Sequence, residues 1–240
     1  MSLEMIQNKK TFQDHSVSCS QPTTDDSLKS HATATIDLLT QTLAHGSCRI
    51  GEIIIMPDFS LRHVDDATIS TSDLEIHTQP EAARQIARYD AALNYRPLKT
   101  APNLRRGWLL QLRKLEEIIL ALDFFYPAAL SLWSSFLQNT LEITPLRETL
   151  NRQTGMYRIT QLLRDDQAQE LVSSFCHSET GCLRKILWKI SHDQVITSLP
   201  KEKLTVSSIP CSKIPLLCRE ACNLLVAAAR PVAKQSLKEN

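Results

Sequence analysis

The C-terminal half of the chain contains CHSETGC at residues 176–182 and CSKIPLLCREAC at residues 211–222. These two stretches hold five of the seven cysteines in the 240-residue sequence. Free cysteine is among the most buried residue types, but packing alone explains such a density poorly. A four-coordinate metal centre requires two closely spaced pairs from separate segments, because each pair supplies two thiolates. The pattern therefore predicts a metal site in the C-terminal half.

The cysteines form two local pairs and leave one nearby thiol. Cys176 and Cys182 bracket a short loop that brings two thiolates toward the same point. Cys218 and Cys222 are four residues apart on the expected first turns of the last helix, where both sulfur atoms leave the same face. Cys211 lies close to the second pair and is an alternative ligand.

The spacing bears on which metal is bound. The first pair is wider than the C-x2–4-C spacing of most structural zinc sites, whereas the second pair falls inside it. An iron–sulfur cube separates its ligand sulfurs further than a single ion does, so wide spacings favour a cluster. A cluster held by thiolates alone is anionic, and basic residues flank the cysteines: Arg184, Lys185, Lys189 and Arg219. We therefore favour an iron–sulfur cluster, with zinc as the alternative. If zinc is bound, the basic residues are expected to be an ordinary solvent-exposed face.

Composition and charge exclude several other classes. The five glycines form neither GxGxxG nor GxxxxGK, which excludes the common nucleotide-binding loops. A net charge of +1 argues against a nucleic-acid-binding protein. No apolar run approaches the roughly 20 residues that span a bilayer, and the N-terminus lacks a signal-peptide core. We expect no membrane partner and a reducing cytoplasm, where the seven thiols stay unpaired.

The chain divides into three parts. Residues 1–32 are polar and are expected to be a disordered tail. Residues 33–140 predict an α+β domain: a small antiparallel sheet over residues 48–78, a helix from Thr78 to about Leu93, and an apolar helical stretch broken at Pro127. Residues 141–240 predict a helical metal-binding domain. The fold class is α+β and mostly helical.

A second candidate site lies in the basic loop before the expected strand at Trp108. Arg105 and Arg106 precede Gly107 and Trp108, and their guanidinium groups suit bidentate contact with an anionic ligand such as a tetrapyrrole carboxylate. The alternative is a basic loop anchored by a buried tryptophan.

Several stretches resemble a known family. PLRETLNRQTGMYRITQLL, LVSSFC, CLRKILW and LCREACNLLVAAAR are similar to the four-iron–four-sulfur-binding C-terminal domain of sirohydrochlorin-chelatase-like multidomain proteins. IGEIIIMPDFSLRHVDD, LNYRPLKTAPNLRRGWLLQL and ALDFFYPAALSLW resemble the stabilising domain that precedes it. The resemblance implies a 4Fe-4S cluster bound by Cys176, Cys182, Cys218 and Cys222, with Cys211 as a spare.

The resemblance also sets expectations about function. The polar residues before the stabilising region leave no room for the chelatase-like domains of that family, so chelatase activity is not carried over. We expect a non-catalytic electron-transfer or accessory protein that serves a protein partner, such as a separate chelatase or redox enzyme, in tetrapyrrole or cobalamin metabolism. The alternative is a zinc-stabilised protein-interaction module without redox activity.

Overall fold

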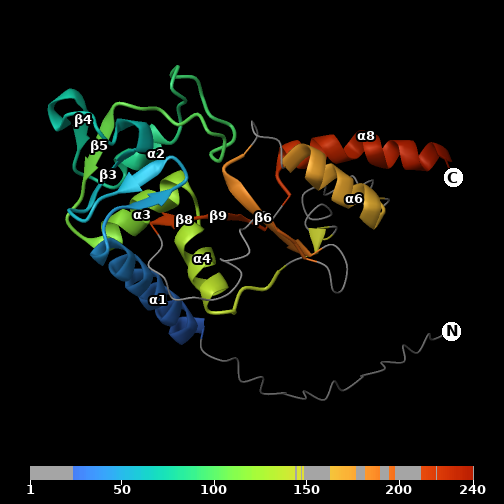
Figure 1. Cartoon of the computed structure of the whole chain (residues 1–240), viewed down its shortest axis with the longest axis horizontal. Helices are drawn as coiled ribbons and strands as arrows, with labels where there is room; N and C mark the ends of the chain where they lie inside the picture. The colour runs from blue at the N-terminus through green and yellow to red at the C-terminus, as the bar shows by residue number, and fades with distance from the viewer. Residues whose placement is uncertain are drawn as a thin grey trace, which may run out of the picture.

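The computed structural model describes residues 24–143, 145, 146, 148, 163–176, 182–189, 195–197, 212–219 and 221–239. Figure 1 shows a group of strands and helices formed by the N-terminal half, with α6 and α8 of the C-terminal half beside it. The predicted α+β class is confirmed. The domain limits at residues 33–140 and 141–240 stay a prediction.

A six-stranded mixed sheet forms the centre of the N-terminal half. Its order is β4-β5-β3-β2-β1-β8. The strands are β1 (Cys48–Ile50), β2 (Ile53–Ile55), β3 (Ser60–His63), β4 (Glu75–His77), β5 (Trp108–Gln111) and β8 (Lys213–Ile214). Antiparallel pairing joins β1 to β2, β2 to β3 and β3 to β5. The expected antiparallel sheet is confirmed for β1–β3, whereas β4 pairs in parallel with β5, a strand that lies outside residues 48–78.

Helices α1 (Thr24–Ala44), α3 (Leu115–Phe125) and α4 (Ala129–Leu137) pack together beside this sheet, as Figure 1 shows. The break at Pro127 is confirmed, because Ala128 takes a left-handed φ of 59° and starts a new helix. α1 begins at Thr24, so its first turns fall inside the residues expected to be a tail. Short 3-10 turns, η1 (Val64–Asp66) and η2 (Thr71–Asp73), lie between β3 and β4.

Helix α2 (Ala82–Ile86) is shorter than the sequence predicted. The chain instead turns after residue 89, because the Asp90 carboxylate accepts hydrogen bonds from the backbone N–H groups of Ala92 and Asn94. Leu93 then takes a left-handed φ of 63°. An aspartate that bonds the backbone two residues on favours such a turn over a helix, so the expected continuation to Leu93 is wrong.

The C-terminal half contains strands as well as helices. Its elements are α6 (Asp165–Leu171), the π-helix η4 (Val172–Cys176), β6 (Arg184–Lys189), β7 (Val195–Thr197), β9 (Leu216–Cys218) and α8 (Asn223–Glu239). β6 pairs with β7 and, in parallel, with β9 to form a three-stranded sheet. The expectation of a helical C-terminal domain is therefore too simple, because pairing with β9 and β7 holds residues 184–189 extended.

The two halves share one hydrophobic core. β8 pairs in parallel with β1, and the Arg49 N–H donates to the Ser212 carbonyl at 2.8 Å. Ile214, Leu216 and Leu217 are buried in the same cluster as the residues of the N-terminal sheet. A second core lies between α6 and α8 and contains Leu146, Leu163, Ala168, Leu171, Val172, Ala221, Leu225, Val226, Ala229 and Ala233.

Among the described helices, no single one has the length and apolar character to cross a membrane. α3 and α4 together pass that test by length and composition, but a bend of 106° separates them. Residues from both helices are buried in the first core, including Ile118, Phe125 and Trp133.

The turn between β1 and β2 is fixed by Tyr126 at the end of α3. The Glu52 N–H donates to the Tyr126 hydroxyl at 3.1 Å. Gly51 has a φ of +58°, and a Cβ added there would lie 2.7 Å from the Tyr126 ring. Burial raises the pKa of Tyr126 to about 12, so its hydroxyl stays protonated.

Replacing Gly51 by alanine is expected to destabilise the protein by about 2–4 kcal/mol, because the methyl group overlaps the buried ring and the left-handed φ is strained. Gly107→Ala is the matched control, since Gly107 has a φ of +78° and nothing within 4 Å of an added Cβ. It should lose only about 1–2 kcal/mol. Urea unfolding of the two variants measures the difference, and equal losses would show that the tyrosine contact adds nothing.

Candidate metal centre

The four cysteines expected to bind the cluster lie at the ends of four different elements. Cys176 ends the π-helix η4, and Cys182 lies two residues before β6. Cys218 ends β9, and Cys222 directly precedes α8. The last pair is therefore not on helical turns, as its spacing suggested: helix α8 starts only at Asn223.

Three of these cysteines pack against one core. Cys176, Cys218 and Cys222 are partly buried and contact the α6–α8 cluster, whereas Cys182 is exposed. Leu171 and Val172 are buried in this core and position Cys176. Leu225 and Val226 are buried in the same core and position the N-terminal end of α8. Hydrophobic packing thus brings together thiols that are far apart in the sequence.

All four thiols are close enough to interact electrostatically. Burial raises the pKa of Cys176 to about 12, and the charges of Cys218, Cys222 and Cys182 add to this increase. Burial also raises the pKa of Cys218 to about 11, and charges on Cys182 and Cys222 act in the same direction. Cys176 and Cys218 are therefore protonated at neutral pH, and metal binding would have to displace their protons.

Three hydrogen-bonding groups surround the sulfur atoms. The Arg184 guanidinium bonds the Cys218 thiol, and its charge acts against burial by lowering the pKa of that thiol. The Leu225 N–H donates to Cys222 Sγ at 3.5 Å, so this sulfur caps the positive end of α8. On the other side, the Cys182 thiol donates to the Thr100 hydroxyl at 3.3 Å. A hydroxyl also donates, so a thiolate at Cys182 would accept from Thr100.

Thr100 is the residue that sequence reasoning missed. It is separated from Cys182 by 82 positions, and nothing in its surrounding sequence points to a metal site. A second hydrogen bond holds Thr100 next to Cys182, because the N–H of the following residue, Leu183, donates to the Thr100 carbonyl at 2.9 Å.

In the described part of the chain, the four thiols lie within electrostatic range of one another but form no compact site for a single ion. Within the part of the chain that the structure describes, no three His, Cys, Asp or Glu side chains are close enough to hold one metal ion. The four thiols nevertheless influence one another's charge.

The other predicted residues have different surroundings. Cys211, the alternative ligand, lies outside the described residues. Cys48 is fully buried within β1. Arg105 forms an ion pair with Glu75 at 2.6 Å, and Arg106 forms one with Asp65. Both guanidinium groups are thus already paired with carboxylates, and their role in anion binding stays a prediction.

Two models of known protein families match this chain. Residues 35–136 match the DR2241 stabilising domain, and residues 138–231 match a 4Fe-4S iron–sulfur cluster binding domain. No curated protein matches the sequence significantly.

A solved structure is similar over most of the chain. It is DR2241 from Deinococcus radiodurans, described as a multi-domain protein with structural similarity to chelatases and two additional novel domains. The match has 29% identity and a TM-score of 0.67 over 86% of this chain. Our chain spans 42% of the length of DR2241. The family recognised from the sequence is confirmed: the chain carries the stabilising domain and the 4Fe-4S domain of the chelatase-like multidomain family of DR2241.

Proposed function

We propose that the chain binds one 4Fe-4S cluster through Cys176, Cys182, Cys218 and Cys222. The observation that carries the proposal is the gathering of these four thiols within the segment that matches a 4Fe-4S domain. Their surroundings suit an anionic group, because Arg184 and the N-terminal end of α8 both face the sulfur atoms.

The proposed role is electron transfer or structural support for a protein partner. A 4Fe-4S cluster supplies one-electron redox chemistry when bound. Four protein thiolates occupy every iron, so substrate coordination at the metal is not part of the proposal. The polypeptide tunes such a centre through hydrogen bonds to sulfur, burial and nearby charge. Thr100 and the Leu225 N–H supply hydrogen bonds to sulfur, and Arg184 supplies both a hydrogen bond and a positive charge.

The partner and compartment follow from the same proposal. DR2241 is similar to chelatases, and our chain matches only part of it. We therefore place the chain beside a chelatase-like protein or a redox enzyme, in a pathway that handles tetrapyrroles. The five described cysteines are free thiols, which suits a reducing compartment such as the cytoplasm.

Alanine substitution of each proposed ligand tests the cluster. Anaerobic reconstitution of the wild-type chain is expected to give about four irons and four sulfides per chain, with the broad absorbance of a cluster. Each variant, C176A, C182A, C218A or C222A, should lose most of the iron, because a cubane cluster takes one thiolate for each iron. Iron and sulfide assays with absorbance spectra measure the loss.

Cys211→Ala and Cys48→Ala are the controls. Both should keep the full iron content, since neither belongs to the proposed ligand set. Loss of iron in C211A with retention in one of the four other variants would reassign the ligands. Wild-type protein that takes up zinc but no iron under anaerobic conditions would contradict the cluster altogether.

Replacing Thr100 by valine is expected to lower the reduction potential of the reconstituted protein by about 20–60 mV. A hydrogen bond to a ligand sulfur stabilises the more negative, reduced state, and valine removes the donor while keeping the shape. Thr100→Ser keeps the hydroxyl and should stay near the wild-type value. Redox titration measures the potentials, and identical values for T100V and wild type would show that Thr100 does not contact a ligand.

A further inference from the structure

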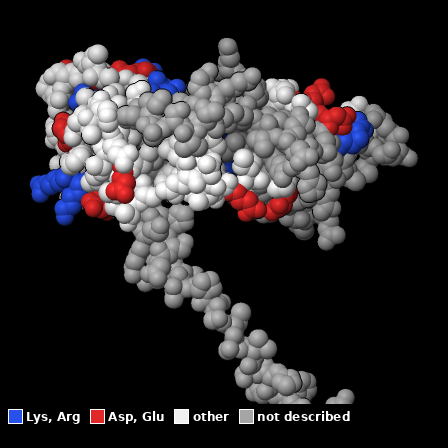
Figure 2. Space-filling model, turned by 60° about the horizontal axis from the view of Figure 1, so that its bottom comes forward, with Lys and Arg blue, Asp and Glu red and all other residues white. Residues whose placement is uncertain are grey.

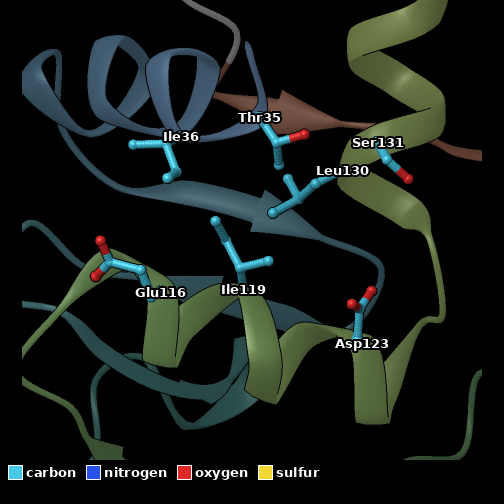
Figure 3. Close-up of a pocket in the computed structure, with 7 residues that line it drawn as sticks. All are labelled: Thr35, Ile36, Glu116, Ile119, Asp123, Leu130 and Ser131. Atoms are coloured by element: carbon cyan, nitrogen blue, oxygen red, sulfur yellow. The ribbon is translucent and has the colours of Figure 1, made fainter. Parts of the chain in front are cut away.

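Two hollows among the described residues are large enough for a small molecule and are candidates for a second site. The first has a volume of about 320 Å³ and lies between α1, α3 and α4. Figure 3 shows Ile36, Ile119 and Leu130 turned toward its centre, with Glu116 and Asp123 at its edges. Its apolar floor and two carboxylates do not select a ligand class, and nothing in the structure shows what covers it.

The second hollow differs in its charge. It is an open groove of about 500 Å³ between α2, the loop of residues 87–99 and the end of α3. Three of its lining residues, Arg84, Arg88 and Lys99, form no ion pair with any carboxylate among the described residues. Unpaired cations around a hollow create a positive potential that attracts anions.

The surroundings of Lys99 show how this charge is concentrated. Its ammonium group donates to the carbonyl of Phe124, another residue that lines the groove, at 2.9 Å. Partial burial lowers the pKa of Lys99, and the positive charges of Arg84 and Arg96 lower it further. An anion bound between these groups would relieve their mutual repulsion.

Aromatic rings line the same groove. The Arg84 guanidinium lies 4.7 Å from the centre of the Phe124 ring, so one wall is a cation stacked on an aromatic face. Tyr95 is 71% exposed, an unusual position for a large ring, and its backbone is held by a bridge to Tyr89. Exposed rings of this kind are the surfaces on which flat ligands stack.

The groove is built on a fixed frame. The Arg96 side chain is buried and donates to the Asn103 amide oxygen and to the carbonyls of Ala87, Lys99 and Ala101. These bonds hold the loop that carries Tyr95 and Lys99. Ligand sites are commonly preformed in this way, with a few polar groups placed on a rigid surface.

We propose that this groove, lined by Arg84, Arg88, Tyr95 and Lys99, binds a small anion that carries a flat unsaturated ring. The ring stacks on Tyr95, and the anionic groups contact Arg88 and Lys99. The volume fits a ligand of roughly nucleotide size. Phosphate and carboxylate groups both satisfy this chemistry. The proposal does not rest on the iron–sulfur cluster, because all of its residues precede the cysteine-bearing segments.

Isothermal titration calorimetry of the full chain with four probes tests the class of ligand. ADP carries a ring and phosphates, a carboxylated porphyrin carries a ring and carboxylates, pyrophosphate has no ring, and adenosine has no charge. At least one of the first two is expected to bind roughly tenfold or more tightly than both of the last two. Whichever of ADP and the porphyrin binds more tightly shows whether the groove prefers phosphate or carboxylate groups. Binding of neither, or equal binding of pyrophosphate, would overturn the proposal.

Two exposed residues test the place of binding without disturbing the core. Arg88→Ala should weaken the ringed anion roughly tenfold, and Tyr95→Ala should weaken it while leaving pyrophosphate unchanged. Arg106→Ala is the matched control, because Arg106 is an exposed arginine outside the groove that pairs with Asp65. If R88A binds the ringed anion with unchanged affinity, or if R106A loses more affinity than R88A, the ligand does not bind in this groove. Equal melting temperatures confirm that the variants fold.

Discussion

The parallel pairing of β8 with β1 is the constraint on which the rest of the structure depends. Only two residue pairs form it, Arg49 with Lys213 and Ile50 with Ile214, but they join the C-terminal half to the N-terminal sheet. Pro215 alone separates β8 from β9, which pairs with β6 in the second sheet. A single extended segment therefore belongs to both sheets and ends at Cys218. Backbone hydrogen bonds therefore connect the N-terminal sheet to the strand that carries Cys218.

The contacts that could be predicted from the sequence are local ones. Ile53–Ile55 form a strand because β-branched residues favour it, and Pro127 ends a helix because it lacks an N–H. The cysteine pairs could be found because each is close in sequence. Pairing partners could not be found this way. Residues 184–189 have a basic amphipathic pattern but form β6, because β9, some 30 positions away, pairs with residues 184–186 and β7 pairs with residues 187–189. The same limitation hid Thr100 beside Cys182.

Arginine shows why charge in a sequence does not by itself locate a site. Arg105 and Arg106 form a conspicuous pair, yet Glu75 and Asp65 neutralise them across the fold. Arg96 is equally basic but is buried and serves the backbone. Arg88, which has no distinctive neighbours in the sequence, lines a groove and forms no ion pair with the carboxylates that the structure describes. Figure 2 agrees with this view, because the coloured basic and acidic groups form small separate patches on the face it shows. The function of each arginine thus depends on distant partners.

The loop from Arg96 to Ala101 connects the two candidate sites. Arg96 fixes it through the carbonyls of Lys99 and Ala101, so the residues between them have little freedom. Within it, Lys99 faces the groove, and the next residue, Thr100, bonds Cys182 and Leu183. Adjacent residues on a rigid loop cannot shift independently, because the backbone bonds of one fix the position of the other. The N-terminal domain therefore does more than support the cysteine-bearing half, since one of its loops contributes directly to the surroundings of a proposed ligand.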